Sequence, residues 1–272
     1  MRALAAWLAL GAAVSGGLGL AFNSYRTQPQ IYLGSIVPEG RFVQVVGLTY
    51  RNQREPWCTG ALIGTNLVLT AAHCVCREPP SDVFVGNDPR KGVQGRSEYY
   101  PVERFKPAAA CNEDFAGRDF ALLKLDRVVP GVAPLAFLSD PAADALQGGT
   151  IVGYGATDIN SSTDDYRKRY AVVPVLSVTC RGSVGQRYGC IEGTEFVGGK
   201  PNFPDTCKGD SGGPLLSVRT LPGTNQEEIL LAGITSRAVR GSQHSCGEGG
   251  IYERMNQRAR NWIASARAAI GA

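Results

Sequence analysis

Short apolar runs separated by turn residues make up most of the chain. Gly, Pro, Asn or Asp bounds most of these runs, and the runs recur at roughly regular spacing. This pattern is typical of the strands of a sandwich or barrel. It predicts strands within residues 42–49, 61–63, 67–71, 120–125, 150–153, 171–176, 214–218 and 229–234.

The last segment has a different period. Residues 253–270 contain neither Gly nor Pro, and their apolar side chains recur near helical spacing, at Met255, Ala259, Trp262, Ile263 and Ala266. This spacing predicts a C-terminal amphipathic helix. Elsewhere the 34 glycines and 16 prolines favour tight turns over long helices. The apolar fraction of 43% excludes a wholly disordered chain.

The N-terminus has the features of a secretory signal. Arg2 precedes an apolar stretch over residues 3–14, which is shorter than the roughly 20 residues a membrane-spanning helix needs. Gly19-Leu20-Ala21 fits a small-x-small cleavage site, so we expect a signal peptide over residues 1–21. The alternative is a buried N-terminal helix. We expect the mature protein to be secreted or periplasmic, with no membrane association.

Cysteine and charge usage exclude several kinds of site. Eight cysteines in an exported chain indicate disulfides. Cys74 and Cys76 lie two apart beside His73, which suggests zinc, but the only other histidine is His244, in a Gly- and Ser-rich loop, and no Cys-x-x-Cys pair exists. We expect no metal and no cofactor. The net charge of +4 comes without a basic run, so we expect no nucleic-acid partner.

The most specific motif is Gly209-Asp210-Ser211-Gly212-Gly213-Pro214. A serine hydroxyl becomes a useful nucleophile when a base takes its proton and fixed donors meet the developing oxyanion. Tight turning at the glycines would direct the N–H groups of Gly209 and Ser211 toward one oxygen, which predicts an oxyanion hole. The alternative is an ordinary glycine-rich hairpin loop.

Two further motifs supply a base and a carboxylate. His73 ends the sequence Leu-Thr-Ala-Ala-His after an apolar run, and Asp119 opens the apolar run Asp-Phe-Ala-Leu-Leu. An aspartate beside an imidazole holds its tautomer and stabilises the imidazolium. Taken singly, His73 also fits a core histidine, and Asp119 fits a residue that begins a strand.

In the order His73, Asp119, Ser211, these motifs resemble the trypsin/chymotrypsin family, over about residues 31–270. Residues 57–63, 153–155, 233–236 and 250–252 also resemble family segments. The resemblance implies an all-β fold of two six-stranded antiparallel β-barrels, the first over about 31–135 and the second over about 136–252, followed by the helix at 253–270.

The resemblance also implies a function. It is that of a secreted, monomeric serine endopeptidase with the catalytic triad His73, Asp119 and Ser211. Its partners would be protein or peptide substrates, an activating protease or a protein inhibitor. The alternative is a catalytically silent homologue that serves as a binding module.

The resemblance implies most of the disulfides. Its pairs are Cys58–Cys74, Cys180–Cys190 and Cys207–Cys246. Cys76 and Cys111 remain, one just after His73 and one eight residues before Asp119. Because the triad brings His73 and Asp119 together, we expect a Cys76–Cys111 bond.

Activation follows from the same resemblance. Ile31 stands where the family's mature N-terminus begins, and its ammonium would pair with Asp210. A buried carboxylate needs such a cation. Residues 22–30 would be a propeptide, which ends at Gln30 and so would be removed by a protease that is not trypsin-like.

Specificity is predicted from Asp205, six residues before Ser211. In the family this position is the floor of the primary pocket, and aspartate there accompanies cleavage after Arg or Lys; Ser236 and Gly250 would line the walls. Alternatively, Asp205 is a turn residue after Pro204. Arg237-Ala238 replaces the usual Trp-Gly.

The loop at 86–98 resembles the family's calcium loop, but Asn87 and Gln94 lack the charged oxygens calcium favours, so we expect no calcium.

Overall fold

The computed structural model describes residues 31–91, 98–160 and 165–272. The expected signal peptide (1–21) and propeptide (22–30) lie outside these ranges, as does Gln94 of the expected calcium-like loop. None of the helices within the described ranges is long and apolar enough to cross a membrane.

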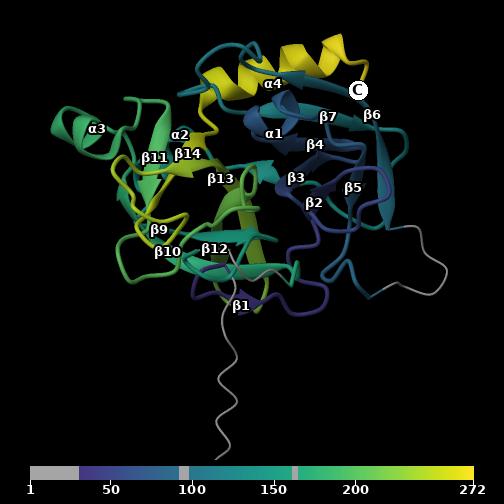
Figure 1. Ribbon diagram of the computed structural model, residues 1–272. Helices are drawn as coiled ribbons and strands as arrows, with labels where there is room; N and C mark the ends of the chain where they lie inside the picture. The colour runs from purple at the N-terminus through teal and green to yellow at the C-terminus, as the bar shows by residue number, and fades with distance from the viewer. Residues whose placement is uncertain (1–30, 92–97, 161–164) are drawn as a thin grey trace, which may run out of the picture.

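The first half of the chain forms a closed six-stranded antiparallel barrel (Figure 1). Its strands pair in the order β2-β3-β4-β7-β6-β5. Most inward positions are Val or Leu, whose side chains suit a pleated, buried surface. The strands are β2 (Val45–Thr49), β3 (Cys58–Gly64), β4 (Leu67–Thr70), β5 (Asp82–Phe84), β6 (Tyr99–Pro107) and β7 (Ala121–Leu125).

The second half forms another six-stranded barrel, closed where β9 pairs with β10. Two short strands extend it: β1 (Ser35–Ile36) beside β10, and β8 (Ala136–Phe137) beside β13. The two-barrel fold expected from the sequence is confirmed. The barrel strands are β9 (Gly148–Gly153), β10 (Arg169–Ser177), β11 (Glu195–Gly198), β12 (Pro214–Thr220), β13 (Glu227–Ala238) and β14 (Gly250–Arg254).

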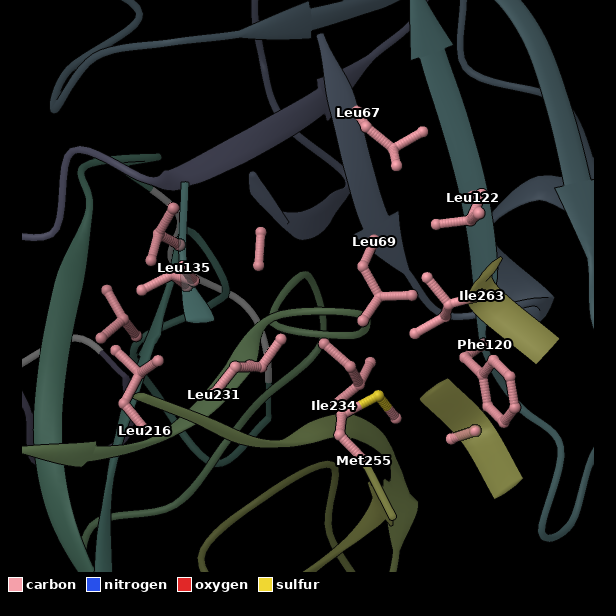
Figure 2. Close-up of a cluster of buried hydrophobic side chains, with 14 of the residues drawn as sticks. Leu67, Leu69, Phe120, Leu122, Leu135, Leu216, Leu231, Ile234, Met255 and Ile263 are labelled. Carbon is pink, nitrogen blue, oxygen red and sulfur yellow. The ribbon is translucent and has the colours of Figure 1, made fainter. Parts of the chain in front are cut away.

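One hydrophobic cluster joins the barrels. In Figure 2, Leu69 and Leu122 of the first barrel face Ile234 and Met255 of the second, with Ile263 of the C-terminal helix packed alongside. All five side chains are buried. Because burying each such side chain contributes about 1.5–3 kcal/mol, this cluster holds the two barrels in a defined arrangement. Loops from both barrels therefore meet in a fixed geometry.

The C-terminal helix, α4 (Gln257–Ala269), begins four residues later than expected. Glu253 and Arg254 instead continue β14, which is paired on both sides with β11 and β13. Asn256 then caps the helix by accepting the N–H of Ala259 at 3.0 Å. The expectation that the helix covers 253–270 is therefore wrong at its start. The remaining helices are α1 (His73–Cys76), α2 (Asp140–Asp144) and α3 (Ser183–Tyr188).

Four disulfides link the loops, and the described residues include no free cysteine. Cys76–Cys111 ties α1 to the loop that precedes β7. Both of these segments carry an expected triad residue. The other bonds are Cys58–Cys74, Cys180–Cys190 and Cys207–Cys246.

Candidate active site

Two neighbouring strands of the first barrel bring His73 and Asp119 together. Thr70, at the end of β4, pairs with Ala121, at the start of β7, so the residues just beyond these ends are adjacent. His73 Nδ1 lies 2.7 Å from Asp119 Oδ2, and the His73 backbone N–H donates to Oδ1 at 3.0 Å. A carboxylate only accepts, so this contact places the imidazole proton on Nδ1 and leaves Nε2 as the acceptor.

Asp119 also receives a hydrogen bond from the second barrel. The Ser236 hydroxyl on β13 donates to Asp119 Oδ2 at 2.7 Å. We expect Ser236 to line the substrate pocket, and in the structure its hydroxyl is directed at Asp119. Asp119 is only 2% exposed. Three donors therefore hold a carboxylate that is almost fully removed from solvent.

The Ser211 loop is pressed against the first barrel. The Thr59 N–H donates to the Ser211 carbonyl at 2.8 Å, and Thr59 is next to Cys58, whose disulfide partner Cys74 adjoins His73. Gly212 has φ +78°, and a Cβ there would lie 2.1 Å from Thr70 Oγ1. Only glycine allows this approach. The structure therefore brings Ser211 to the edge of the barrel that carries His73.

Gly209 has the backbone conformation expected of a glycine-dependent turn. Its φ is +100°, and its carbonyl accepts the Thr59 hydroxyl at 2.8 Å. Among the described residues, neither the Gly209 N–H nor the Ser211 N–H donates to another protein group. Both N–H groups are therefore available to a substrate oxygen.

Asp210 lies buried beneath this turn. Its Oδ1 accepts the Gly155 N–H and its Oδ2 accepts the Cys207 N–H, each at 2.8 Å. Ile31 is also fully buried in the second barrel, and the carbonyl of the next residue, Tyr32, accepts the N–H of Asp205 at 3.2 Å. The segment that begins at Ile31 is thus packed into the same barrel as the Ser211 loop.

Asp205 is almost fully enclosed, at 1% exposure. Its Oδ2 accepts the N–H groups of residues 247, 248 and 249 at 2.9–3.2 Å, and its Oδ1 accepts the Thr206 N–H at 2.9 Å. Burial raises the pKa of Asp205 to about 6, although these N–H donors oppose the rise. A nearby cation would lower that pKa again.

There is little free space at Gly250, in the wall of the pocket above Asp205. Gly250 is buried, and a Cβ at this position would lie 3.1 Å from Thr206 Oγ1 and 3.3 Å from the Tyr252 hydroxyl oxygen. That hydroxyl is buried and has no hydrogen-bond partner among the described residues. Burial also raises the pKa of Tyr252 far above its usual value, so the hydroxyl stays neutral. An orphaned buried hydroxyl carries a free-energy cost that a polar ligand or a water molecule would relieve.

A cavity of about 430 Å³ adjoins His73 and Asp119. The loop 113–116 forms one side of it, and Ser236 and Arg237 form the other. A cavity of this size beside the imidazole is a candidate ligand site.

A metal is not favoured by the one cluster of ligand-type atoms found among the described residues, Cys58, His73 and Cys74. The two sulfurs are joined in a disulfide, so neither is a thiolate. His73 is then the one possible ligand left in this cluster, and a single residue does not make a metal site.

Comparison with known proteins supports the family expected from the sequence motifs. The Trypsin family model matches residues 31–263. The chain belongs to the trypsin family. Human "Serine protease 56" is 32% identical over 86% of this trypsin-family chain, which spans only 38% of that protein. "Glucanase inhibitor protein 3" of Phytophthora infestans is 30% identical, covering 85% of this chain and 86% of its own length. The structure of mouse neuropsin, a serine protease, superposes with a TM-score of 0.66 at 23% identity, over 86% of this chain and 98% of that one, and supports the fold.

This trypsin-family chain also has buried ionisable residues near His73 and Asp119 that the sequence did not reveal. Glu195 and Glu253 are at most 1% exposed, and Glu253 accepts the Asp119 N–H at 3.0 Å. Arg237 pairs with Glu195 through two contacts of 2.7 and 2.9 Å. Acidic residues inside strands are uncommon unless they are paired, so the Glu in each of two strands was the available signal.

Proposed function

We propose that this trypsin-family protein is a secreted serine endopeptidase that cleaves after Arg or Lys. The observation that carries the proposal is the 2.7 Å contact of His73 Nδ1 with buried Asp119, at the barrel edge against which the Ser211 loop is clamped. A base oriented in this way next to a serine is the arrangement that activates a hydroxyl nucleophile.

The reaction is acyl transfer. The Ser211 oxygen attacks the scissile carbonyl carbon as His73 Nε2 takes the hydroxyl proton. His73 then gives that proton to the leaving amine nitrogen, and the C–N bond breaks. Water repeats the sequence on the acyl-enzyme and releases the acid. Asp119 keeps the imidazole oriented and stabilises its cationic form throughout.

The oxyanion is held by the N–H groups of Gly209 and Ser211. Both groups lack an acceptor among the described residues, and the φ of +100° at Gly209 supports this role. One donor of this kind is worth about 3 kcal/mol of transition-state stabilisation.

Specificity for Arg and Lys rests on Asp205. Its carboxylate is buried, and the unpartnered Tyr252 hydroxyl lies next to the same pocket wall. A substrate cation would satisfy this carboxylate, whereas an apolar side chain would leave it buried and unpaired. The glycine at position 250 leaves space that any side chain there would fill.

Activation is by cleavage before Ile31. Two observations support this proposal: Ile31 is buried in the core of the second barrel, and the bridge between Tyr32 and Asp205 couples the segment to the specificity pocket. The new ammonium would pair with Asp210. The four disulfides suit an exported protein, and the protease that removes the propeptide would be a partner.

A second candidate is a binding module without peptidase activity. The similarity to a protein named as a glucanase inhibitor, over most of both chains, favours this alternative. Against it, His73, Asp119 and Ser211 are all present.

Reaction with a fluorophosphonate separates the two candidates. Protein that begins at Ile31 should become labelled on Ser211, as located by peptide mass spectrometry. Ser211→Ala protein is the matched control and should not react. A parent protein that stays unlabelled while folded would exclude the peptidase and favour the binding module.

A further inference from the structure

Three ionisable side chains, Arg237, Glu195 and Glu253, lie behind Asp119 and have no part in the proposed reaction. Glu195 on β11 and Glu253 on β14 stand directly opposite each other in an antiparallel pair. Arg237 on β13 binds Glu195 in a two-pronged contact, with Nη1 2.7 Å from Oε1 and Nη2 2.9 Å from Oε2. This geometry gives the strongest form of carboxylate–guanidinium bond.

A β-bulge explains how Arg237 reaches inward. The pairing of β13 with β14 slips between Thr235 and Arg237, so that Ser236 is the extra residue. A bulge changes the direction of the side chains next to it. Ser236 can therefore bind Asp119 while the next residue, Arg237, binds Glu195 and also donates to the Gly189 carbonyl at 3.0 Å.

The two glutamates hold the backbone that carries Asp119. Glu253 Oε1 accepts the N–H of Asp119 at 3.0 Å, and Glu195 Oε1 accepts the N–H of Gly117 at 2.9 Å. Arg237 Nη1 also lies 3.3 Å from Ser236 Oγ, which donates to Asp119. The three side chains therefore contact the backbone of Asp119 directly, and they reach its carboxylate through Ser236.

The group is arranged to add no net charge near Asp119. Burial, together with the charges of Glu195 and Asp119, raises the pKa of Glu253 to about 9, so Glu253 is neutral near pH 7. Arg237 is the cation for Glu195, which also accepts the N–H of Ile191 at 2.7 Å. A neutral Glu253 can donate its proton to Glu195 and still accept from Asp119.

We propose that the half-buried Arg237 and the buried Glu195 and Glu253 form a positioning network that holds Asp119 and balances the charge around the His73–Asp119 pair. The catalytic consequence rests on the proposed peptidase function, whereas the electrostatic one does not. Arg237 thus acts as a support for the triad, with its guanidinium bound to Glu195.

The charge balance predicts opposite effects for two changes. Arg237→Met removes a cation, which stabilises the imidazolium and moves the titration midpoint of His73 upward. Glu195 keeps two backbone N–H donors in that variant. Glu195→Gln/Glu253→Gln removes the anion while each amide oxygen can still accept a backbone N–H. This leaves Arg237 unbalanced and moves the midpoint downward. The other charged groups facing His73 across the cavity, Glu113 and Asp114, are unchanged in both.

The test is a proton NMR titration of the histidine Cε1–H signals. The chain has two histidines, so His244→Gln assigns the His73 signal directly. All proteins carry Ser211→Ala to prevent self-cleavage. The control is Arg219→Met, which breaks an exposed ion pair with Glu228 far along β12 and β13. We expect midpoint shifts of about half a unit or more, upward and downward respectively, and none in the control.

Shifts in the same direction in both variants, or none in either, would overturn the inference. If Arg237→Met fails to fold, the downward shift in the double-glutamine variant decides alone, and its absence counts against the network. These readouts do not require peptide cleavage. If the parent protein proves inactive but the two variants shift the midpoint as expected, upward in Arg237→Met and downward in the double-glutamine variant, the proposed function is contradicted and the network is supported. In an active parent, the acid limb of kcat/KM moves with the midpoint.

Discussion

Lys168 should destabilise the fold, because its ammonium is enclosed between Phe42 and Tyr154 with little compensation. The residue is 1% exposed. Its Nζ donates to the Phe42 carbonyl at 3.1 Å and lies 5.6 Å from the centre of the Tyr154 ring. Burial lowers the pKa of Lys168 from 10.5 to about 7, with Glu39 giving only a small opposing effect.

The magnitude follows from that pKa. At about 1.4 kcal/mol per unit, holding the charge in the folded state costs about 5 kcal/mol relative to the unfolded chain. Lys168→Met removes this cost but also loses a charge-assisted hydrogen bond of about 1.5–3 kcal/mol and a cation–π contact of about 1 kcal/mol. The variant should therefore gain roughly 1–2 kcal/mol in the free energy of unfolding at pH 6.

The lowered pKa of Lys168 determines how the free energy of unfolding changes with pH. Between about pH 7 and 10.5 the unfolded chain holds the Lys168 proton and the folded chain releases it, so the parent becomes more stable as the pH rises. From pH 6 to pH 9.5 the parent gains about 3 kcal/mol in this way, so Lys168→Met should be the more stable protein at pH 6 and the less stable one at pH 9.5, by roughly 1–2 kcal/mol in each case. Urea unfolding followed by tryptophan fluorescence, in a Ser211→Ala background, measures both values. Exposed Lys91→Met is the control. An equal gain at the two pH values, or no gain at pH 6, would refute the reasoning.

Three further predictions concern the site. Asp205→Ser should lower kcat/KM for Arg and Lys peptides by about 100-fold or more, and for Phe peptides much less. In calorimetry on Ser211→Ala protein, an aryl amidinium should bind more weakly as the pH falls through about 6, where Asp205 gains its proton. Binding that does not change with pH would count against this role of Asp205. Cys76→Ala/Cys111→Ala opens a link across 35 residues and should reduce the free energy of unfolding by about 4 kcal/mol, with an unchanged urea midpoint as the contrary result. Gly212→Ala places a Cβ against Thr70 and should cost about 2–4 kcal/mol together with most of the fluorophosphonate reactivity, whereas a fully reactive variant would mean that the loop is not clamped.

Much of the fold could be predicted because its signals are local. Short strands with turn residues between them define a barrel protein, and the motifs around His73, Asp119 and Ser211 occupy the ends of such strands. The Cys76–Cys111 bond, present in the structure, could be anticipated because the expected meeting of His73 and Asp119 brings the two loops together.

The charged interior could not be predicted because it depends on strand register. Glu195 and Glu253 lie 58 positions apart in the sequence, and only the pairing of β11 with β14 sets them opposite each other. The inward turn of Arg237 requires a bulge at Ser236, which no sequence pattern marked. The start of α4 was misplaced for a related reason. Glu253 and Arg254 fit a helical period, but pairing on both sides keeps them in β14.

The proposal that this chain cleaves after Arg and Lys by a serine mechanism is tested most directly on a diverse peptide library. Protein beginning at Ile31 and its Ser211→Ala variant are incubated with the library, and new termini are identified by mass spectrometry. The account predicts cuts that follow Arg and Lys in the first sample and no cuts in the second. A parent protein that leaves the library intact, or that cuts after Phe as readily as after Arg, would contradict it.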